Sequence, residues 1–355
     1  MRLTISDGSA ASLVCVAGIV RIFSDVVMNG QKLYNSGWIA VLLGGLFTLP
    51  IALAASLLKR TYPQGSALTR PKNLLLRRLF SGFFLLLSIV YLLLAAGTTR
   101  TISTTANFIA LTNSVHALLL LPQLAVCALA LCAGGTAIGE SAHLWKKILA
   151  ALLLLVIVLR ISVLRPGWLY PLLGPGWPDL FSSGLRIAGK LSLLFSACLL
   201  SQENPRYPRR LSPLRILAVV VGLSSAMLLL RSMQIPPMTD GKTESSFFQL
   251  STLLTNGTAP LTMQLPLIVL WFVGLFFLLL FDSWMGATLL SLAIPSLPHS
   301  LVMILSVSGV CIGSILGNSL TTEIAGSPTL LYGSSLLLFL SLLLQHRSGG
   351  EPRNA

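Results

Sequence analysis

Ten long apolar runs occupy most of this chain, and they constrain its fold more than any other feature of the sequence. They cover residues 8–29, 37–58, 79–99, 115–133, 147–164, 184–201, 212–231, 264–292, 299–318 and 328–345. Most of these runs have about the 20 residues that a helix needs to cross the hydrocarbon core of a bilayer. The sequence therefore predicts an all-α integral membrane protein with about ten transmembrane helices in a single membrane domain, residues 1–355.

Positive charge falls on alternate turns between the runs. The basic residues on one side are Arg2, Lys59, Arg60, Arg70, Lys72, Arg77, Arg78, Lys146, Lys147, Arg206, Arg209, Arg210, Arg215, Arg347 and Arg353. The intervening loops hold only scattered basic residues. Because short cytoplasmic loops carry an excess of Lys and Arg, we expect both termini in the cytoplasm, with residues 346–355 as a cytoplasmic tail.

The composition supports a membrane protein without a separate soluble domain. Of the 355 residues, 54% are hydrophobic and only 10% are charged, whereas a soluble domain has about 25% charged residues. The formal net charge is +14, and these charges flank the apolar runs. We therefore assign them to topology and to contact with anionic lipid head groups rather than to nucleic acid.

A segment rich in proline and glycine, residues 165–183, divides the ten runs five and five. We expect it to form an outer loop between a first five-helix repeat, residues 8–164, and a second, residues 184–345. Many secondary transporters consist of two such repeats of inverted topology. This count favours a LeuT-like transporter fold with a five-plus-five inverted repeat.

Charged side chains within the apolar runs are the candidates for a functional site. Arg21 and Asp25 lie in the first run, Lys190 in the sixth and Asp282 in the eighth, and the polar end of the third run includes Thr98. Charges inside a bilayer are costly and usually face a partner or a cavity. Arg21 and Asp25 are four residues apart on one helix face, so they form either an ion pair with each other near the outer interface or part of the site.

Glycines provide a second set of candidates. Gly18, Gly184 and Gly189 would permit interruptions of the first and sixth helices, where free backbone groups could meet the carboxylate and amine of a substrate. The predicted substrate-binding set is therefore Gly18, Arg21, Asp25, Thr98, Gly184, Gly189, Lys190 and Asp282. Gly309, Gly313 and Gly317 form two overlapping Gly-x-x-x-Gly steps. Such a groove serves either packing inside the protein or contact with another subunit.

Motifs for catalysis are missing from the sequence. The four histidines are scattered, no two cysteines form a Cys-x-x-Cys pair, and neither a phosphate-binding loop nor a Gly-x-Ser-x-Gly elbow is present. The five cysteines lie in or beside apolar runs and are interpreted as small buried hydrophobes. We therefore expect no enzyme activity, no catalytic residue, no metal site and no cofactor.

Several short segments resemble one family of membrane proteins. They are Ser36–Gly45 at the entry to the second helix, Lys59–Pro63 at its basic end, Gly135–Glu140 after the fourth helix, Leu172–Pro175 before the sixth, and Leu270–Phe272 at the start of the eighth. By these segments the chain resembles the spore germination permeases, the B subunits of nutrient germinant receptors, in the amino acid–polyamine–organocation superfamily. The resemblance implies a ligand site between the first, third, sixth and eighth helices.

The resemblance also implies a function. A nutrient, an amino acid in the leading hypothesis, would bind within the spore inner membrane and signal germination through an A-type membrane subunit and a lipoprotein. One alternative is an ion-coupled amino acid transporter of the same fold, with Asp282 or Lys190 as the coupling group. Another is a membrane scaffold without transport, in which the Gly309–Gly313–Gly317 groove would be the interface.

Overall fold

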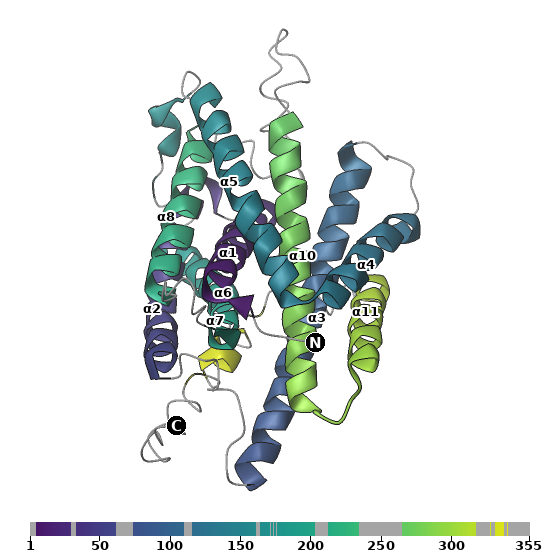
Figure 1. Ribbon diagram of the computed structural model, residues 1–355. Coiled ribbons are helices and arrows are strands. Elements are labelled where there is room, and N and C mark those ends of the chain that lie inside the picture. The colour runs from purple at the N-terminus through teal and green to yellow at the C-terminus, as the bar shows by residue number, and fades with distance from the viewer. Residues whose placement is uncertain are drawn as a thin grey trace.

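The chain forms a bundle of helices, as predicted (Figure 1). The computed structural model describes residues 5–29, 33–61, 74–109, 116–160, 164–170, 172, 174, 176–202, 212–233, 265–316, 327, 331–336 and 339. The α-helices are α1 (Asp7–Asn29), α2 (Gly37–Thr61), α3 (Leu74–Ile109), α4 (His116–Ala133), α5 (Gly135–Arg160), α6 (Trp177–Leu194), α7 (Ser196–Leu200), α8 (Pro213–Ser232), α10 (Leu265–Ala293) and α11 (His299–Leu316). Two 3₁₀ helices, η2 (Tyr34–Ser36) and η5 (Pro166–Leu169), and two short strands, β1 (Ile5–Ser6) and β2 (Ser201–Gln202), complete the described elements.

Length and apolar character identify the helices that can cross a membrane. Within the described residues, six spans pass this test: α1, α2, α3, α6 with α7, α8 and α10. The bent pair of α4 and α5 makes a seventh candidate if it is counted as one span, and α11 is a shorter apolar helix. The tenth predicted run, residues 328–345, lies largely outside the described residues, although residues 331–336 are helical.

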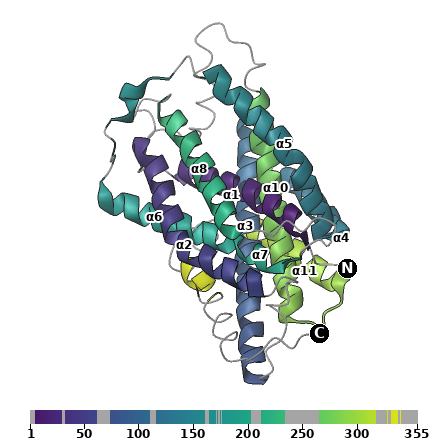
Figure 2. The same ribbon diagram turned by 60° about the vertical axis from the view of Figure 1, so that its left-hand side comes forward.

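Helix α1 lies in the interior of the bundle, as the two views in Figures 1 and 2 show. It contacts α5, α6, α8 and α10, whereas α2 packs against α6 and α8, and α3 packs along α10 and α11. Leu13 and Ala17 of α1 are fully buried, as are Phe281 and Trp284 of α10. Every charged side chain on the inner faces of α1 must therefore find a partner within the protein.

The junction between α4 and α5 differs from the sequence prediction. Lys146 and Lys147 were expected in a cytoplasmic loop, but α5 begins at Gly135, one residue after the turn, and both lysines lie within it. Gly134 has a φ of 90°, which glycine adopts without steric cost, and the two helices bend there by 112°. A Cβ atom on Gly135 would lie 2.6 Å from Nε1 of Trp284, so this tight turn also depends on the missing side chain.

The predicted outer loop, residues 165–183, is shorter than expected. Helix α6 begins at Trp177, seven residues before the predicted start of the second repeat at residue 184. Pro178 is at the start of the helix, where its missing N–H group costs nothing. The proline that indicated a loop is therefore part of the first helical turn.

Glycines allow close approach at two helix crossings. A Cβ atom on Gly44 of α2 would lie 2.6 Å from Cγ2 of Ile187 on α6, and one on Gly184 would lie 2.9 Å from Cβ of Leu43. On α11, Gly309 and Gly313 face Leu92 and Ala96 of α3. These two positions therefore serve packing inside the protein, whereas Gly317 lies outside the described residues.

The α2–α6 crossing generates the first testable prediction. Gly44→Ala should lower the stability of the protein by about 1–3 kcal/mol, because the new methyl group overlaps Cβ of Ile187 and approaches the carbonyl oxygen of Gly184. The matched control is Gly222→Ala on α8, where the added Cβ has no neighbour within 4 Å, and where alanine should be neutral or slightly stabilising. Thermal unfolding of the purified variants measures both effects, and equal midpoints would contradict the close packing.

Candidate functional site

Three buried ion pairs each have one partner on α1. Arg21 pairs with Asp282 of α10 and Asp25 pairs with Lys190 of α6. Nearer the start of the helix, Asp7 pairs with Lys59 of α2 at 2.8 Å. The side chains of Arg21 and Asp282 are 5% and 1% exposed, so this pair is shielded from solvent. The structure thus brings together four of the predicted site residues across α1, α6 and α10.

Of the two alternatives for Arg21 and Asp25, an ion pair with each other is not what the structure shows. The two residues share a face of α1, but each charge pairs with a different neighbouring helix. A buried charge needs an opposite charge within a few ångströms. If Arg21 and Asp25 neutralised each other, Asp282 and Lys190 would both be left buried without a counter-ion.

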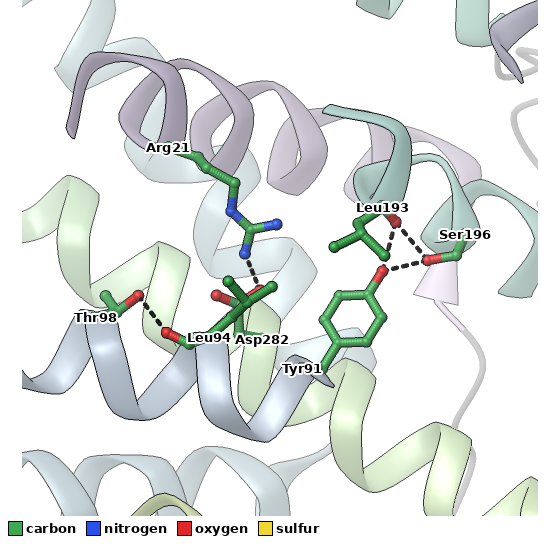
Figure 3. Close-up of polar contacts among 7 residues, drawn as sticks. All are labelled: Arg21, Tyr91, Leu94, Thr98, Leu193, Ser196 and Asp282. Carbon is green, nitrogen blue, oxygen red and sulfur yellow. Dashed lines mark hydrogen bonds and ion pairs between the residues drawn. The ribbon is translucent and has the colours of Figure 1, made fainter. Parts of the chain in front are cut away.

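The Arg21–Asp282 pair leaves one donor and one acceptor open (Figure 3). Nη2 of Arg21 donates to Oδ1 of Asp282. Nη1 of Arg21 and Oδ2 of Asp282 are buried and have no hydrogen-bond partner among the residues that the structure describes. Figure 3 shows the second terminal nitrogen of Arg21 pointing away from the carboxylate. Most buried polar atoms in proteins are hydrogen-bonded, so these two atoms mark a place where a polar ligand would be stabilised.

The predicted helix interruptions at glycines are not observed. Helix α1 is continuous through Gly18, and α6 is continuous through Gly184 and Gly189. A Cβ atom on Gly18 would lie 3.0 Å from Cγ1 of Val220, so the lack of a side chain here serves helix packing. The predicted contact of these glycines with a substrate stays a prediction.

In the sixth run the α-helical hydrogen-bond pattern is interrupted at one residue, Phe195 between α6 and α7, while its backbone stays in the right-handed helical region. The carbonyl oxygen of Leu193 there accepts hydrogen bonds from the hydroxyl groups of Tyr91 and Ser196, at 2.5 and 2.6 Å. The Tyr91 ring is completely buried and packs edge-on against Phe281, with centroids 6.3 Å apart. Phe281 also lies below the guanidinium of Arg21, 6.0 Å from it. Tyr91 therefore connects the interruption at Phe195 to Phe281, which lies beside Arg21 of the ion pair.

Sequence reasoning missed Tyr91 and Ser196. Both lie in apolar runs, where a tyrosine resembles an ordinary core aromatic and a serine a small packing residue. The available signal was chemical, because a hydroxyl group in the middle of a membrane helix needs a hydrogen-bond partner. Thr98, which was predicted, is buried on α3, and its hydroxyl donates to the carbonyl oxygen of Leu94 in the same helix.

The donor set describes what the site can hold. Arg21 of α1 offers an N–H group and Asp282 of α10 offers a carboxylate oxygen. The ring of Phe281 lies beside Arg21, and Tyr91 of α3 packs against Phe281. Among the residues that the structure describes, no group of three or more His, Cys, Asp and Glu side chains could hold a metal ion. The arrangement suits a small polar molecule that both accepts and donates a hydrogen bond.

A double-mutant cycle tests the ion pair. Arg21→Met should destabilise the protein by about 3–5 kcal/mol, because it leaves Asp282 as an uncompensated buried charge. Adding Asp282→Leu should recover much of that loss, whereas adding Asp25→Leu to Arg21→Met should not. Thermal unfolding is measured for five proteins: the unmodified protein, the single variants Arg21→Met and Asp282→Leu, and the two double variants. If adding Asp25→Leu restored the stability of the Arg21→Met protein and adding Asp282→Leu did not, the result would instead support an ion pair between Arg21 and Asp25.

Comparison with solved structures gives the fold. The chain matches the Eremococcus coleocola manganese transporter in complex with an aromatic bis-isothiourea compound with a TM-score of 0.58 and 15% identity, over 96% of this chain and 77% of that chain. It also matches a histidine-to-alanine variant of that transporter with a TM-score of 0.54 and 16% identity, over 97% and 78% of the two chains. At this identity the likeness shows a shared membrane transporter fold. No curated protein matches the sequence.

The family follows from the sequence match. The model of a family described as spore germination protein, a family of permeases, matches residues 5–201. This range covers more than half of the chain and extends from β1 to β2. It includes Arg21, Asp25, Tyr91 and Lys190, whereas Asp282 lies beyond it. The chain is therefore an integral membrane protein that belongs to the spore germination permease family.

Proposed function

We propose that this protein binds a free L-amino acid between α1, α3, α6 and α10 and acts as the permease-like subunit of a germinant receptor. The observation that carries the proposal is that Nη1 of Arg21 and Oδ2 of Asp282, the outer atoms of one ion pair, are both buried without a hydrogen-bond partner among the described residues. The ligand carboxylate would accept from Nη1 of Arg21, and the ligand ammonium would donate to Oδ2 of Asp282. Both bonds would be charge-assisted, which makes them stronger than bonds between neutral groups.

Charge balance favours a zwitterion over other small polar ligands. Arg21 and Asp282 neutralise each other, so a ligand with one positive and one negative group adds no net charge to a buried site. A simple amine or a simple acid would introduce an uncompensated charge, which is costly away from water. A divalent cation at Asp282 would be repelled by the guanidinium of Arg21.

The surrounding contacts supply a route from binding to a change of shape. A ligand shifts a conformational equilibrium only by its differential affinity for the two states. Here the ligand would compete for groups that join α1 to α10, and the adjacent Asp25–Lys190 pair joins α1 to α6. The interruption at Phe195, bound by Tyr91, would let the end of the sixth span move separately. The change would pass to the A-type subunit and the lipoprotein expected for this family.

The proposal includes the finer features of the architecture. The likeness to the manganese transporter over 96% of this chain supports a transporter fold, and with it the five-plus-five inverted repeat. The alternation of basic loops supports cytoplasmic termini. The family supports the spore inner membrane as the site of action.

A binding experiment on the purified protein tests the ligand class. Each L-amino acid would be compared with the 2-hydroxy acid that lacks its ammonium group and with the amine that lacks its carboxylate. A ligand that binds only the folded state adds about 2.7 kcal/mol of stability at a hundredfold excess over Kd. At least one amino acid should raise the unfolding temperature, and its two analogues should bind about tenfold more weakly or worse, because each leaves one charge unpaired.

Two variants keep this experiment interpretable. The double variant Arg21→Met with Asp282→Leu removes both binding groups while avoiding a lone buried charge, and it should show no ligand-induced shift. Lys147→Met, on the exposed face of α5, should bind like the unmodified protein. Equal shifts by the amino acid, the hydroxy acid and the amine would contradict recognition by this pair.

Spores test the physiological role. Spores that lack this protein should lose the germination response to at least one nutrient, and the unmodified gene should restore it while Asp282→Asn should not. A deletion strain that responds normally to every nutrient would refute the receptor role. In that case, uptake of a labelled amino acid into proteoliposomes under an imposed pH or sodium gradient would support the ion-coupled transporter.

A further inference from the structure

Four elements meet at the end of the bundle where α1 begins. Strand β1, just before α1, pairs in parallel with β2, just after α7, so that Ile5 lies opposite Ser201 and Ser6 opposite Gln202. This contact joins segments that are almost 200 residues apart. Lys59, near the end of α2, and Gly139, in the first turns of α5, lie against the same strand pair. We call Ile5, Ser6, Asp7, Lys59, Ser201 and Gln202 the N-terminal latch.

Lys59 is the centre of the N-terminal latch. Its ammonium group forms the ion pair with Asp7 at 2.8 Å and donates hydrogen bonds to the carbonyl oxygen and to the hydroxyl of Ser201, the latter at 3.0 Å. The residue is only 8% exposed and Asp7 only 3%. Carbonyl groups at the end of a helix lack partners within the helix, and a cation there also meets the negative end of the helix dipole. One buried charge thus fixes α2, the start of α1 and the end of α7 together.

Close packing reinforces these polar contacts. Ile5 is 1% exposed, and a Cβ atom on Gly139 of α5 would lie 2.5 Å from Cδ1 of Ile5. One turn further along α1, the hydroxyl of Ser12 accepts a hydrogen bond from Lys146 at 2.9 Å and lies 3.1 Å from Nδ1 of His143. The start of α1 is therefore attached to α5 as well as to α2 and α7.

The interruption at Phe195 is the point at which α7 would move relative to α6, and the N-terminal latch holds the other end of α7. Helix α7 has only five residues and is separated from α6 by the interruption. Any movement of α7 relative to α6 at Phe195 would require the release of its far end. That far end is Ser201, which the N-terminal latch holds by a strand pair and by Lys59.

We propose that the N-terminal latch is a gate, which must open before the interior of the bundle is exposed at the end where α1 begins. Asp7, Lys59 and Ser201 join α1, α2 and α7 in this structure, which would be the closed state of the gate. Opening separates β1 from β2 and lets α7 move away from α1. This inference rests on the proposed function in one respect, the identity of the ligand that the open gate would admit. The test of the gate uses no ligand.

Cys198 reports on the gate because it lies on α7 and is fully buried. The test uses a protein that keeps Cys198 and has its other four cysteines replaced by alanine. In membranes, a water-soluble maleimide should label Cys198 slowly, and Lys59→Met should increase the labelling rate about tenfold or more, because the loss of one partner of a buried ion pair strongly weakens the closed state. The control Lys147→Met, which removes an exposed charge from α5, should leave the rate unchanged.

A reversible crosslink separates gating from unfolding. Ser6→Cys and Gln202→Cys would join the paired strands, which lie about 4.8 Å apart, within the range of a disulfide. In the Lys59→Met protein this disulfide should return the labelling of Cys198 to the slow rate. Reduction, followed by removal of the reductant, should restore the fast rate, with labelling measured on the peptide that contains Cys198 because the two introduced thiols also react. An unfolded protein would label fast whether or not the strands are joined.

Three outcomes would overturn the gate. The first is an unchanged labelling rate in Lys59→Met. The second is fast labelling that persists after the disulfide has formed. The third is failure of the two cysteines to crosslink, which would contradict the strand register itself. Because no nutrient is present, all three are independent of whether the protein binds an amino acid.

Discussion

The buried charges on α1 are the constraint on which the rest of this structure depends. A charge in the interior of a membrane protein is tolerated only beside an opposite charge, so Arg21 and Asp25 determine where α10 and α6 must lie. Asp7 has the same effect on α2. Apolar packing alone holds membrane helices together with little preference for one register over another, because lipid is as apolar as the side chains it contacts. The ion pairs supply that register.

The same charges make the interior chemically useful. Arg21 and Asp282 meet through one hydrogen bond and leave one donor and one acceptor buried without a partner among the described residues. A fully satisfied pair would stabilise the bundle and bind nothing. An incompletely satisfied pair holds the helices together less tightly, but it could exchange part of its interaction for a ligand. This combination of structural and binding roles in one contact is what the proposed function requires.

The two ends of α1 and the interruption after α6 form one connected system. Tyr91 binds the carbonyl oxygen of Leu193 beside the interruption and packs on Phe281 beside Arg21. On the other side of the interruption, α7 leads in five residues to Ser201 and the N-terminal latch. A change at the ion pair therefore has a short path of packed side chains to the end of the bundle where α1 begins.

Much of the fold could be predicted from local properties of the sequence. Nine of the ten apolar runs correspond to described helices, and the tenth lies largely outside the described residues. The agreement arises because the length of an apolar run decides whether a helix can cross a bilayer. The errors concern the two connections that were expected to be longer loops. Gly134 joins α4 and α5 in a sharp bend, and Pro178, in the segment expected to form a loop, begins α6. In both cases the helix begins earlier than the apolar run indicated, because one glycine or proline suffices for the turn.

The candidate site was predicted only as a set of residue types. The sequence by itself determined that a few charges must lie in the membrane and must be neutralised there, because that cost depends on the side chain and its depth. Only the tertiary structure decided that Arg21 pairs with Asp282, 261 residues away, rather than with Asp25. It likewise decided that Tyr91 reaches the interruption at Phe195. Coulomb attraction acts through space, so the partner of a charge depends on which helices lie side by side, and the order of residues along the chain does not contain that information.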